Sequence, residues 1–153
     1  MKKRDLKGII HEVRNVLCCY NGRDEILSEV ALLLKEKISH YNWVGFYILT
    51  AEKDMLYLGP FAGEPTIHTS IPVGKGICGQ VAVNKETMIV QDVNSQENYL
   101  SCSIDVKSEI VVPIFKNNSF VAELDIDSHT KSPFTDIDKK ILEEICKELS
   151  VVF

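Results

Sequence analysis

The amino-acid sequence predicts a single α+β domain spanning residues 1–153, with a central antiparallel sheet and the N- and C-terminal helices packed on one of its faces. Three observations support this prediction. Long helical patterns occur only near the two ends of the chain, strand-like segments fill the middle, and short polar turns join neighbouring strands into hairpins. Hairpins make antiparallel pairs, and helices at both chain ends are free to pack together on one sheet face. A length of 153 residues is normal for one domain.

The helical patterns have recognisable boundaries. Apolar residues recur at helical spacing over residues 6–17, and the Asn21–Gly22 pair ends this first helix. The same spacing recurs over residues 26–38. Near the other end, residues 135–138 read TDID, a capping box with Asp in place of Glu or Gln. The helix that follows is expected to bury Ile137, Ile141, Leu142, Ile145 and Leu149.

Six strands are expected in the middle of the chain, where aromatic, branched and other apolar residues gather in short runs. They cover residues 42–49, 55–61, 68–73, 87–93, 108–115 and 119–128, with a short helix at about 77–84 between the third and the fourth. A long polar loop, residues 94–108, precedes the fifth strand. Structureless loops above roughly 12–15 residues are uncommon and often line a binding site.

Composition excludes several classes of protein. The net charge is −5 and the isoelectric point is about 5.4, which argues against nucleic acid as a partner. No apolar run approaches the roughly 18 residues of a membrane helix, and charges interrupt the N-terminal stretch where a signal peptide would be apolar. We therefore expect a cytoplasmic protein with reduced thiols, and its odd number of cysteines, five, also disfavours a disulfide framework.

Residues 74–79, GKGICG, match the GxGxxG pattern of dinucleotide-binding proteins. The following helix is too short for that interpretation, and the chain lacks alternating βαβ units. Two other interpretations remain open. The glycines and the helix start can bind a small anion such as a carboxylate, or they can simply form a tight turn.

The five cysteines fall into two groups. Cys18, Cys19 and Cys146 lie in helical patterns, where core packing is the expected role. Cys78 begins a short helix behind the glycines, and Cys102 lies in the polar loop. A helix N-terminus lowers the pKa of a thiol, which favours the nucleophilic thiolate. The paired spacing of a zinc site is absent from the sequence, and a cysteine–histidine protease pair has no local signature.

Acidic and aromatic residues share faces of the expected strands. Asp125 and Asp127 lie on one face because strand side chains alternate, and Glu109 begins the neighbouring strand. Converging acids can raise a pKa enough to create a proton donor, or can hold a substrate ammonium; a solvated sheet face is the alternative. Trp43 and Tyr47 also share a face, and can either line an apolar site or pack in the core.

Together these segments resemble the GAF domain, and more narrowly the free methionine-(R)-sulfoxide reductases. The resemblance extends from residue 42 to the last helix. It rests on NWVGFY, LGPFAGEP, IPVGKGICG, DV, KSEIVVPI and LDIDS, which occur in order and at matching intervals. The glycine and SEIVVP motifs are common to many GAF domains, whereas NWVGFY with LGPF and LDIDS is much more specific.

The resemblance implies a thiol-dependent reduction of free methionine sulfoxide. By position, Cys102 matches the catalytic cysteine and Cys78 a resolving cysteine. The substrate-binding and acidic residues of the family match Trp43, Tyr47, Glu109, Asp125 and Asp127. The implied cycle forms a sulfenic acid on Cys102 and a disulfide, with thioredoxin or another thiol as electron donor and no bound cofactor or metal. Such domains also often form homodimers.

Two departures from the family pattern affect the redox step. Many members carry a third cysteine ten residues before the GICG cysteine, where this chain has His68. The family's GHIACD segment reads NYLSCS here, with Tyr99 in place of His and Ser103 in place of Asp. The alternative function is a GAF module that binds a small molecule and regulates a partner. Consumption of a thiol reductant distinguishes the enzyme from such a sensor.

Overall fold

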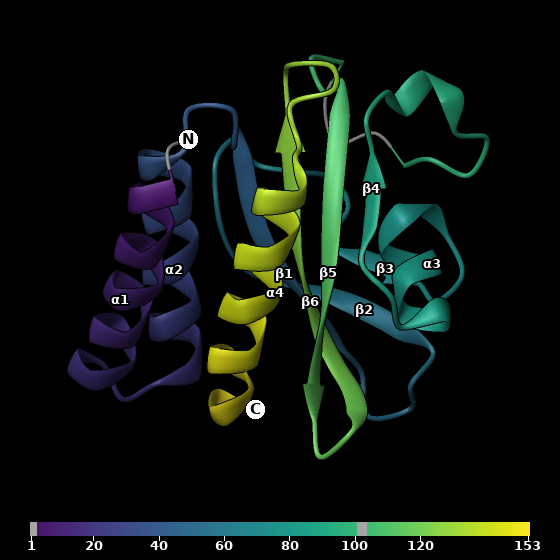
Figure 1. The fold of residues 1–153 in the computed structure, drawn as a ribbon. Coiled ribbons are helices and arrows are strands. Elements are labelled where there is room, and N and C mark those ends of the chain that lie inside the picture. The colour runs from purple at the N-terminus through teal and green to yellow at the C-terminus, as the bar shows by residue number, and fades with distance from the viewer. Residues whose placement is uncertain (1–2, 101–103) are drawn as a thin grey trace.

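The computed structural model describes residues 3–100 and 104–153, and side-chain environments from residue 7 onward within these ranges. This part of the chain forms a six-stranded sheet in the order β3-β2-β1-β6-β5-β4, and every neighbouring pair is antiparallel (Figure 1). The helices are α1 (Lys3–Cys19), α2 (Arg23–Lys37), α3 (Gly76–Asn84) and α4 (Asp136–Leu149). The strands are β1 (Trp43–Leu49), β2 (Met55–Ala62), β3 (Ser70–Pro72), β4 (Met88–Val90), β5 (Ser108–Lys116) and β6 (Ser119–Ser128).

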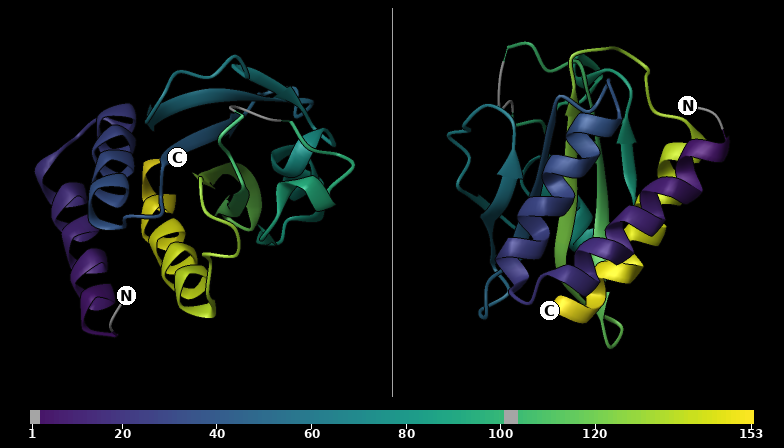
Figure 2. Two further views of the ribbon diagram at one scale, coloured as in Figure 1. Left: turned by 90° about the horizontal axis from the view of Figure 1, so that it is seen from above. Right: turned by 90° about the vertical axis from the view of Figure 1, so that its left-hand side faces the viewer.

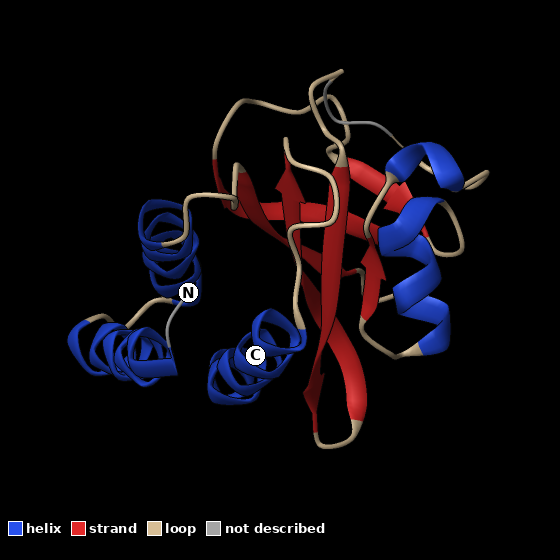
Figure 3. Ribbon diagram, turned by 45° about the horizontal axis from the view of Figure 1, so that its top comes forward, coloured by secondary structure: helices blue, strands red, loops and turns tan. Residues whose placement is uncertain are grey.

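The predicted fold class is confirmed. Helices α1, α2 and α4 lie on one side of the sheet, and α3 lies on the other (Figure 3). Helix α2 contacts β1 and β2, α4 contacts β5, and α1 packs on α2 and α4 from outside (Figure 2). The predicted order of elements is also confirmed, although β3 and β4 are shorter than the segments 68–73 and 87–93 that the sequence suggested.

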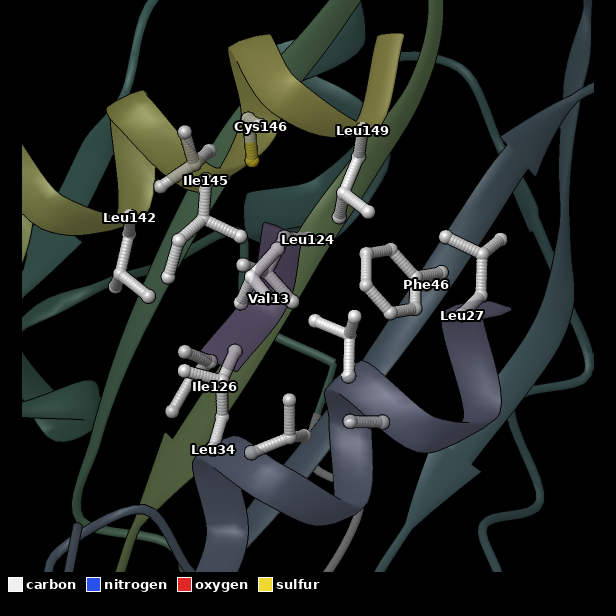
Figure 4. Packing of buried hydrophobic residues seen from close by; sticks show 14 of the residues in the cluster. Val13, Leu27, Leu34, Phe46, Leu124, Ile126, Leu142, Ile145, Cys146 and Leu149 are labelled. Atoms are coloured by element: carbon white, nitrogen blue, oxygen red, sulfur yellow. The ribbon is translucent and has the colours of Figure 1, made fainter. Parts of the chain in front are cut away.

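Strand alternation divides the buried side chains between two layers. Even-numbered residues of β1 and β5, and those of β6 from Ala122 to Ile126, face α1, α2 and α4 and form the larger core, which includes Phe46 and Leu124 (Figure 4). Odd-numbered residues of the same strands face α3. They include Trp43 and Tyr47, which belong to a second, smaller core. The second face holds the candidate site.

Two predictions of burial are wrong. Cys18 and Cys19 are exposed, because α1 turns Ile9 and Val13 toward the core and ends at Cys19. Ile137 is 38% exposed in the first turn of α4. The remaining helical cysteine, Cys146, is buried in the larger core as expected. Among the described residues, no helix has the length and apolar character to cross a membrane.

The predicted capping box at the start of α4 is confirmed and belongs to a buried network. The Thr135 hydroxyl accepts a hydrogen bond from the Asp138 N–H. In return, Asp138 Oδ2 accepts one hydrogen bond from the Thr135 N–H and one from the Thr135 hydroxyl, and both are 2.8 Å long. Asp138 Oδ1 accepts from the Tyr41 hydroxyl at 2.7 Å and lies 3.2 Å from His40 Nε2. Burial alone would raise the pKa of Asp138, but these hydrogen bonds lower it well below its ordinary value.

We expect Asp138→Asn to lower the free energy of unfolding by about 2–3 kcal/mol at pH 7, because it removes charge-assisted hydrogen bonds from a buried group. A carboxylate with a lowered folded pKa stabilises the fold above its unfolded pKa of about 3.9, and this contribution is lost as pH falls toward the folded pKa. Urea unfolding should therefore show the difference from the parent shrinking from about pH 5 downward. A difference that stays constant over this range, or an equal loss in the exposed Asp136→Asn, would contradict the prediction.

Candidate active site

Acidic residues gather on the sheet face that α3 covers. Glu109 on β5 pairs with Asp127 on β6, and Asp127 pairs in turn with Trp43 on β1. One step along β6, Asp125 lies between Val111 and Gly45. The next residue on this face is Glu123. We call these four residues, Glu109, Glu123, Asp125 and Asp127, the acidic cluster.

The acidic cluster is buried, so the interpretation of these acids as a solvated sheet face is wrong. Its side chains are at most 5% exposed, and Glu123 is completely buried. Glu123 was missed by the sequence analysis, although the same period-two rule that paired Asp125 with Asp127 also places it on this face. Both Glu123 oxygens and one Asp125 oxygen have no hydrogen-bond partner among the described residues.

Burial changes the protonation of these carboxyl groups. Loss of solvent raises the pKa of Asp125 to about 6, although hydrogen bonding with Glu109 and Cys78 partly opposes this shift. Burial likewise raises the pKa of Glu123 well above its ordinary value, and the neighbouring Asp125 raises it further. Carboxyl groups in this environment can hold and donate a proton near neutral pH.

Three aromatic residues, Trp43, Tyr47 and Phe61, adjoin the acidic cluster, and we call them the aromatic wall. The Trp43 and Phe61 rings stack with centroids 5.6 Å apart, and Tyr47 lies 6.4 Å from Trp43. The Trp43 Nε1–H donates to the Glu64 carbonyl at 3.0 Å, and the Tyr47 hydroxyl donates to the His68 carbonyl at 2.8 Å. These bonds hold both aromatic side chains in place, and they satisfy polar groups that burial would otherwise leave unpaired.

Gly45 allows the tryptophan to lie flat on the sheet. A β-carbon at this position would stand 2.3 Å from a Trp43 ring carbon, closer than any real contact. The glycine in NWVGFY is therefore explained by the close approach of the ring, because only glycine leaves room for it.

Cys78 lies in the first turn of α3 and faces the acidic cluster. Its Sγ is buried and lies 3.8 Å from Glu109 Oε1. Burial raises the pKa of the Cys78 thiol well above its ordinary value, and Asp125, Glu123 and Glu109 raise it further. The expectation that the helix N-terminus would favour a thiolate here is therefore wrong, because desolvation and like charges dominate over the helix.

The glycine motif, residues 74–79, forms a tight turn, and the Asn98 side chain makes hydrogen bonds with it. Gly74 and Gly76 have φ values of +94° and +63°, which glycine adopts without strain. The Gly76 N–H, at the helix start, donates to Asn98 Oδ1 at 2.8 Å, and the Asn98 amide donates to the Gly74 carbonyl at 3.0 Å. Since Asn98 occupies the helix start, the tight-turn interpretation is favoured over binding of a free anion. The sequence carried no evident signal for Asn98.

Cys102 lies outside the described residues. The described residues before and after it are anchored: Asn98 is bound to the glycine turn, and the Lys107 N–H donates to the Ser128 carbonyl at 2.8 Å. Leu100 packs against the smaller core, within 3.4 Å of the space that a β-carbon on Gly76 would occupy. The chain is thus anchored beside α3 as far as Leu100.

We expect Asn98→Ala to lower reductase turnover more than it lowers stability. The substitution removes two hydrogen bonds that tie the Cys102 loop to α3, each worth about 1 kcal/mol. Loss of loop position should lower kcat/KM by about tenfold, because misplacing a reacting group is costly. The measurement compares kcat/KM and thermal unfolding with those of Asn15→Ala, on the exposed surface of α1. Unchanged kcat/KM would show that the two hydrogen bonds of Asn98 have no role in positioning the loop.

The fold and the site together define the class of protein. The GAF domain family matches residues 22–153. GAF domain-containing protein A of Dictyostelium discoideum is 34% identical over 97% of this chain and 92% of its own length. The free methionine-R-sulfoxide reductase of Escherichia coli is 36% identical over 82% of this chain and 74% of its own length.

A solved structure agrees with these relatives. The X-ray structure of free methionine-R-sulfoxide reductase from Neisseria meningitidis in complex with its substrate has a TM-score of 0.91 and 33% identity, covering 97% of this chain and 87% of that one. The chain therefore belongs to the GAF domain family, and within it to the free methionine-R-sulfoxide reductases.

Proposed function

We propose that this protein reduces free L-methionine-(R)-sulfoxide to methionine. The observation that carries the proposal is the buried acidic cluster beside an aromatic wall, on the sheet face toward which Cys78 points. Family membership supports it, since relatives of this name cover most of the chain.

The two halves of the site suit the two ends of the substrate. Glu109, Asp125 and Asp127 supply negative charge for the α-ammonium group, and burial strengthens that attraction because little water screens it. Trp43 and Tyr47 supply flat apolar surface for the methyl end. A residue in a long methionine-containing chain lacks the free ammonium, so the acids favour the free amino acid.

The reaction begins at Cys102. Its sulfur attacks the sulfoxide sulfur while a carboxylic acid, for which Asp125 is our candidate, gives a proton to the sulfoxide oxygen. The oxygen ends on Cys102 as a sulfenic acid and methionine leaves. The substrate sulfur gains the two electrons that the cysteine loses, and the thiol proton passes to the carboxylate.

Cys78 is the candidate that resolves the sulfenic acid. Its thiol condenses with Cys102 to form a disulfide and release water, and thioredoxin or another thiol then restores both cysteines. His68 cannot perform this step, although Tyr47 holds its carbonyl beside the aromatic wall. The raised pKa of Cys78 requires that a neighbouring carboxylate accept the thiol proton as the bond forms.

Cys78→Ser should leave the first turnover intact and slow the cycle. We expect one equivalent of methionine per chain without reductant, and a thioredoxin-supported kcat lowered by roughly tenfold or more, because the sulfenic acid then lacks its internal partner. Rapid quench followed by amino-acid analysis measures the first turnover. Cys146→Ser is the matched control, since this buried thiol lies in the other core. Full thioredoxin-supported turnover in Cys78→Ser would mean that the reductant attacks Cys102 directly.

The test of the function is oxidation of NADPH by thioredoxin and thioredoxin reductase in the presence of free L-methionine-(R)-sulfoxide. We expect turnover of the (R) form, little with the (S) epimer, and none without this protein. A folded protein that binds the sulfoxide but consumes no thiol would instead be a sensor module. The homodimer, the cytoplasmic location, the absence of nucleic-acid and membrane partners and the single domain over residues 1–153 stay predictions.

A further inference from the structure

The Cys78 thiol and two carboxylates form a group of donor atoms with a spacing near that of metal ligands. Cys78 Sγ, one oxygen of Glu109 and one oxygen of Asp125 all lie within 4.8 Å of one another, and all three residues are buried. The distance from Sγ to Glu109 Oε1 is 3.8 Å. A tetrahedral Zn²⁺, with bonds of about 2.3 Å to sulfur and about 2.1 Å to oxygen, sets two such donor atoms about 3.6 Å apart.

Glu123 provides an independent indication of a ligand. Its side chain is completely buried, and neither oxygen makes a hydrogen bond with a described residue. The Cys78 thiol is near enough to change its pKa, yet no hydrogen bond of acceptable geometry forms between them. A buried carboxylate without a partner is costly, and a cation bound nearby would offset that cost.

The negative charge of these buried carboxylates favours a cation that carries more than one positive charge. Among the described residues, no lysine, arginine or histidine makes an ion pair with Glu123 or Asp125. A substrate ammonium carries a single positive charge. Several buried carboxylates and a thiol within reach of one point can therefore hold protons or bind a divalent cation, because they cannot all be ionised and uncompensated.

We propose that Cys78, Glu109 and Asp125 bind one thiophilic divalent cation of the Zn²⁺ type, and that the Glu123 carboxylate stabilises this cation from outside the three ligands. The sulfur ligand selects against Mg²⁺ and Ca²⁺, which take oxygen ligands. The cation is a reversible ligand, distinct from a structural zinc, since the fold has its own packed cores without it.

Binding of the cation has a consequence that rests on the proposed function. The cation would occupy the carboxylates that hold the substrate ammonium, and its bond to Cys78 would block the resolving thiol. It therefore acts as an inhibitor that competes with methionine sulfoxide and leaves when a chelator is added.

Binding is tested without any assay of activity. Cadmium is the probe, because a thiolate bound to Cd²⁺ gives a charge-transfer absorbance in the ultraviolet. The parent for this experiment carries Cys18→Ser and Cys19→Ser, which removes the two thiols that are exposed among the described residues, and Cys102→Ser, which removes the candidate nucleophile as a competing Cd²⁺ ligand. We expect one Cd²⁺ per chain with this absorbance, and competition by Zn²⁺ in calorimetry.

Three variants decide which residues hold the metal. Cys78→Ser should abolish the absorbance, Glu123→Gln should weaken affinity about tenfold or more, and Cys146→Ser should change neither. Glu52→Gln, in the exposed β1–β2 turn, controls for charge, and near-ultraviolet circular dichroism verifies that each variant is folded. Absorbance that persists in Cys78→Ser, or affinity unchanged in folded Glu123→Gln, would overturn the site.

Activity then separates the two proposals. Turnover that falls with Zn²⁺, recovers with chelator and is protected by high substrate supports the inhibitory role. Turnover that is insensitive to Zn²⁺ at full occupancy overturns that role and leaves the reductase standing. Metal binding in a protein with no turnover under any thiol reductant would refute the reductase and leave the metal site standing.

Discussion

Replacing Cys102 by serine will abolish reduction of free L-methionine-(R)-sulfoxide, with a loss of about a thousandfold or more in kcat/KM. Serine retains the shape of the side chain but lacks the nucleophilic thiolate and cannot form a sulfenic acid, so no step of the cycle remains. The measurement is NADPH oxidation coupled through thioredoxin, repeated with dithiothreitol to supply electrons directly. Substrate binding, followed by calorimetry, should persist because the acidic cluster and aromatic wall are unchanged.

The matched control is Cys146→Ser, which removes a buried thiol on the opposite side of the sheet. It should retain turnover, apart from any loss of stability from a polar atom in the larger core. Substantial turnover in Cys102→Ser would move the nucleophile to Cys78, the other cysteine of the candidate site. A trap for sulfenic acids, followed by mass spectrometry of the peptide, would then identify the reacting residue.

Asp125→Asn should give the second largest effect, a loss of about 10²–10⁴-fold in kcat/KM. Asparagine preserves the shape of the side chain but removes both the charge that attracts the ammonium and the proton that Asp125 can donate. Burial raises the pKa of Asp125 to about 6, so the carboxyl group holds a transferable proton close to neutral pH. Steady-state kinetics should show kcat falling as well as KM rising, because the proton is needed only as the sulfur–oxygen bond breaks.

Glu52→Gln is the control for Asp125→Asn, since it removes one negative charge from an exposed turn. Thermal unfolding should show Asp125→Asn to be as stable as the parent or more stable, because one charge fewer is buried in the acidic cluster. A change confined to KM would limit Asp125 to binding the ammonium, and the proton donor would then have to be another member of the cluster.

Much of the candidate site follows from local rules. Alternation along β6 puts Asp125 and Asp127 on one face and Ile126 on the other, and the structure agrees. The same rule also places Glu123 on this face, although Glu123 lies just before the LDIDS segment on which the family resemblance rests. The roles of Cys102 and Cys78 remain predictions from that resemblance.

Other features of the site could not be predicted because they depend on contacts between distant segments. Asn98 fastens the loop to a glycine turn 22 residues earlier in the chain. The environment of Cys78 depends on Glu109 and Asp125 from two different strands. A helix N-terminus alone indicated a low pKa for this thiol, and only the packing of α3 on the sheet showed that burial raises it.

The sequence by itself determined the order of the elements, the antiparallel pairing, the cap of α4 and the two faces of each long strand. These properties depend on residues near one another in the chain, so periodicity and turn chemistry are enough to predict them. The tertiary structure decided which of the two sheet faces α3 closes, and this determines the burial of the acidic cluster and the protonation of Asp125 and Cys78. It also decided which face of α1 turns toward the core, and this leaves Cys18 and Cys19 exposed. Solvation is the physical reason, because the pKa and the reactivity of a group depend on everything that displaces water around it.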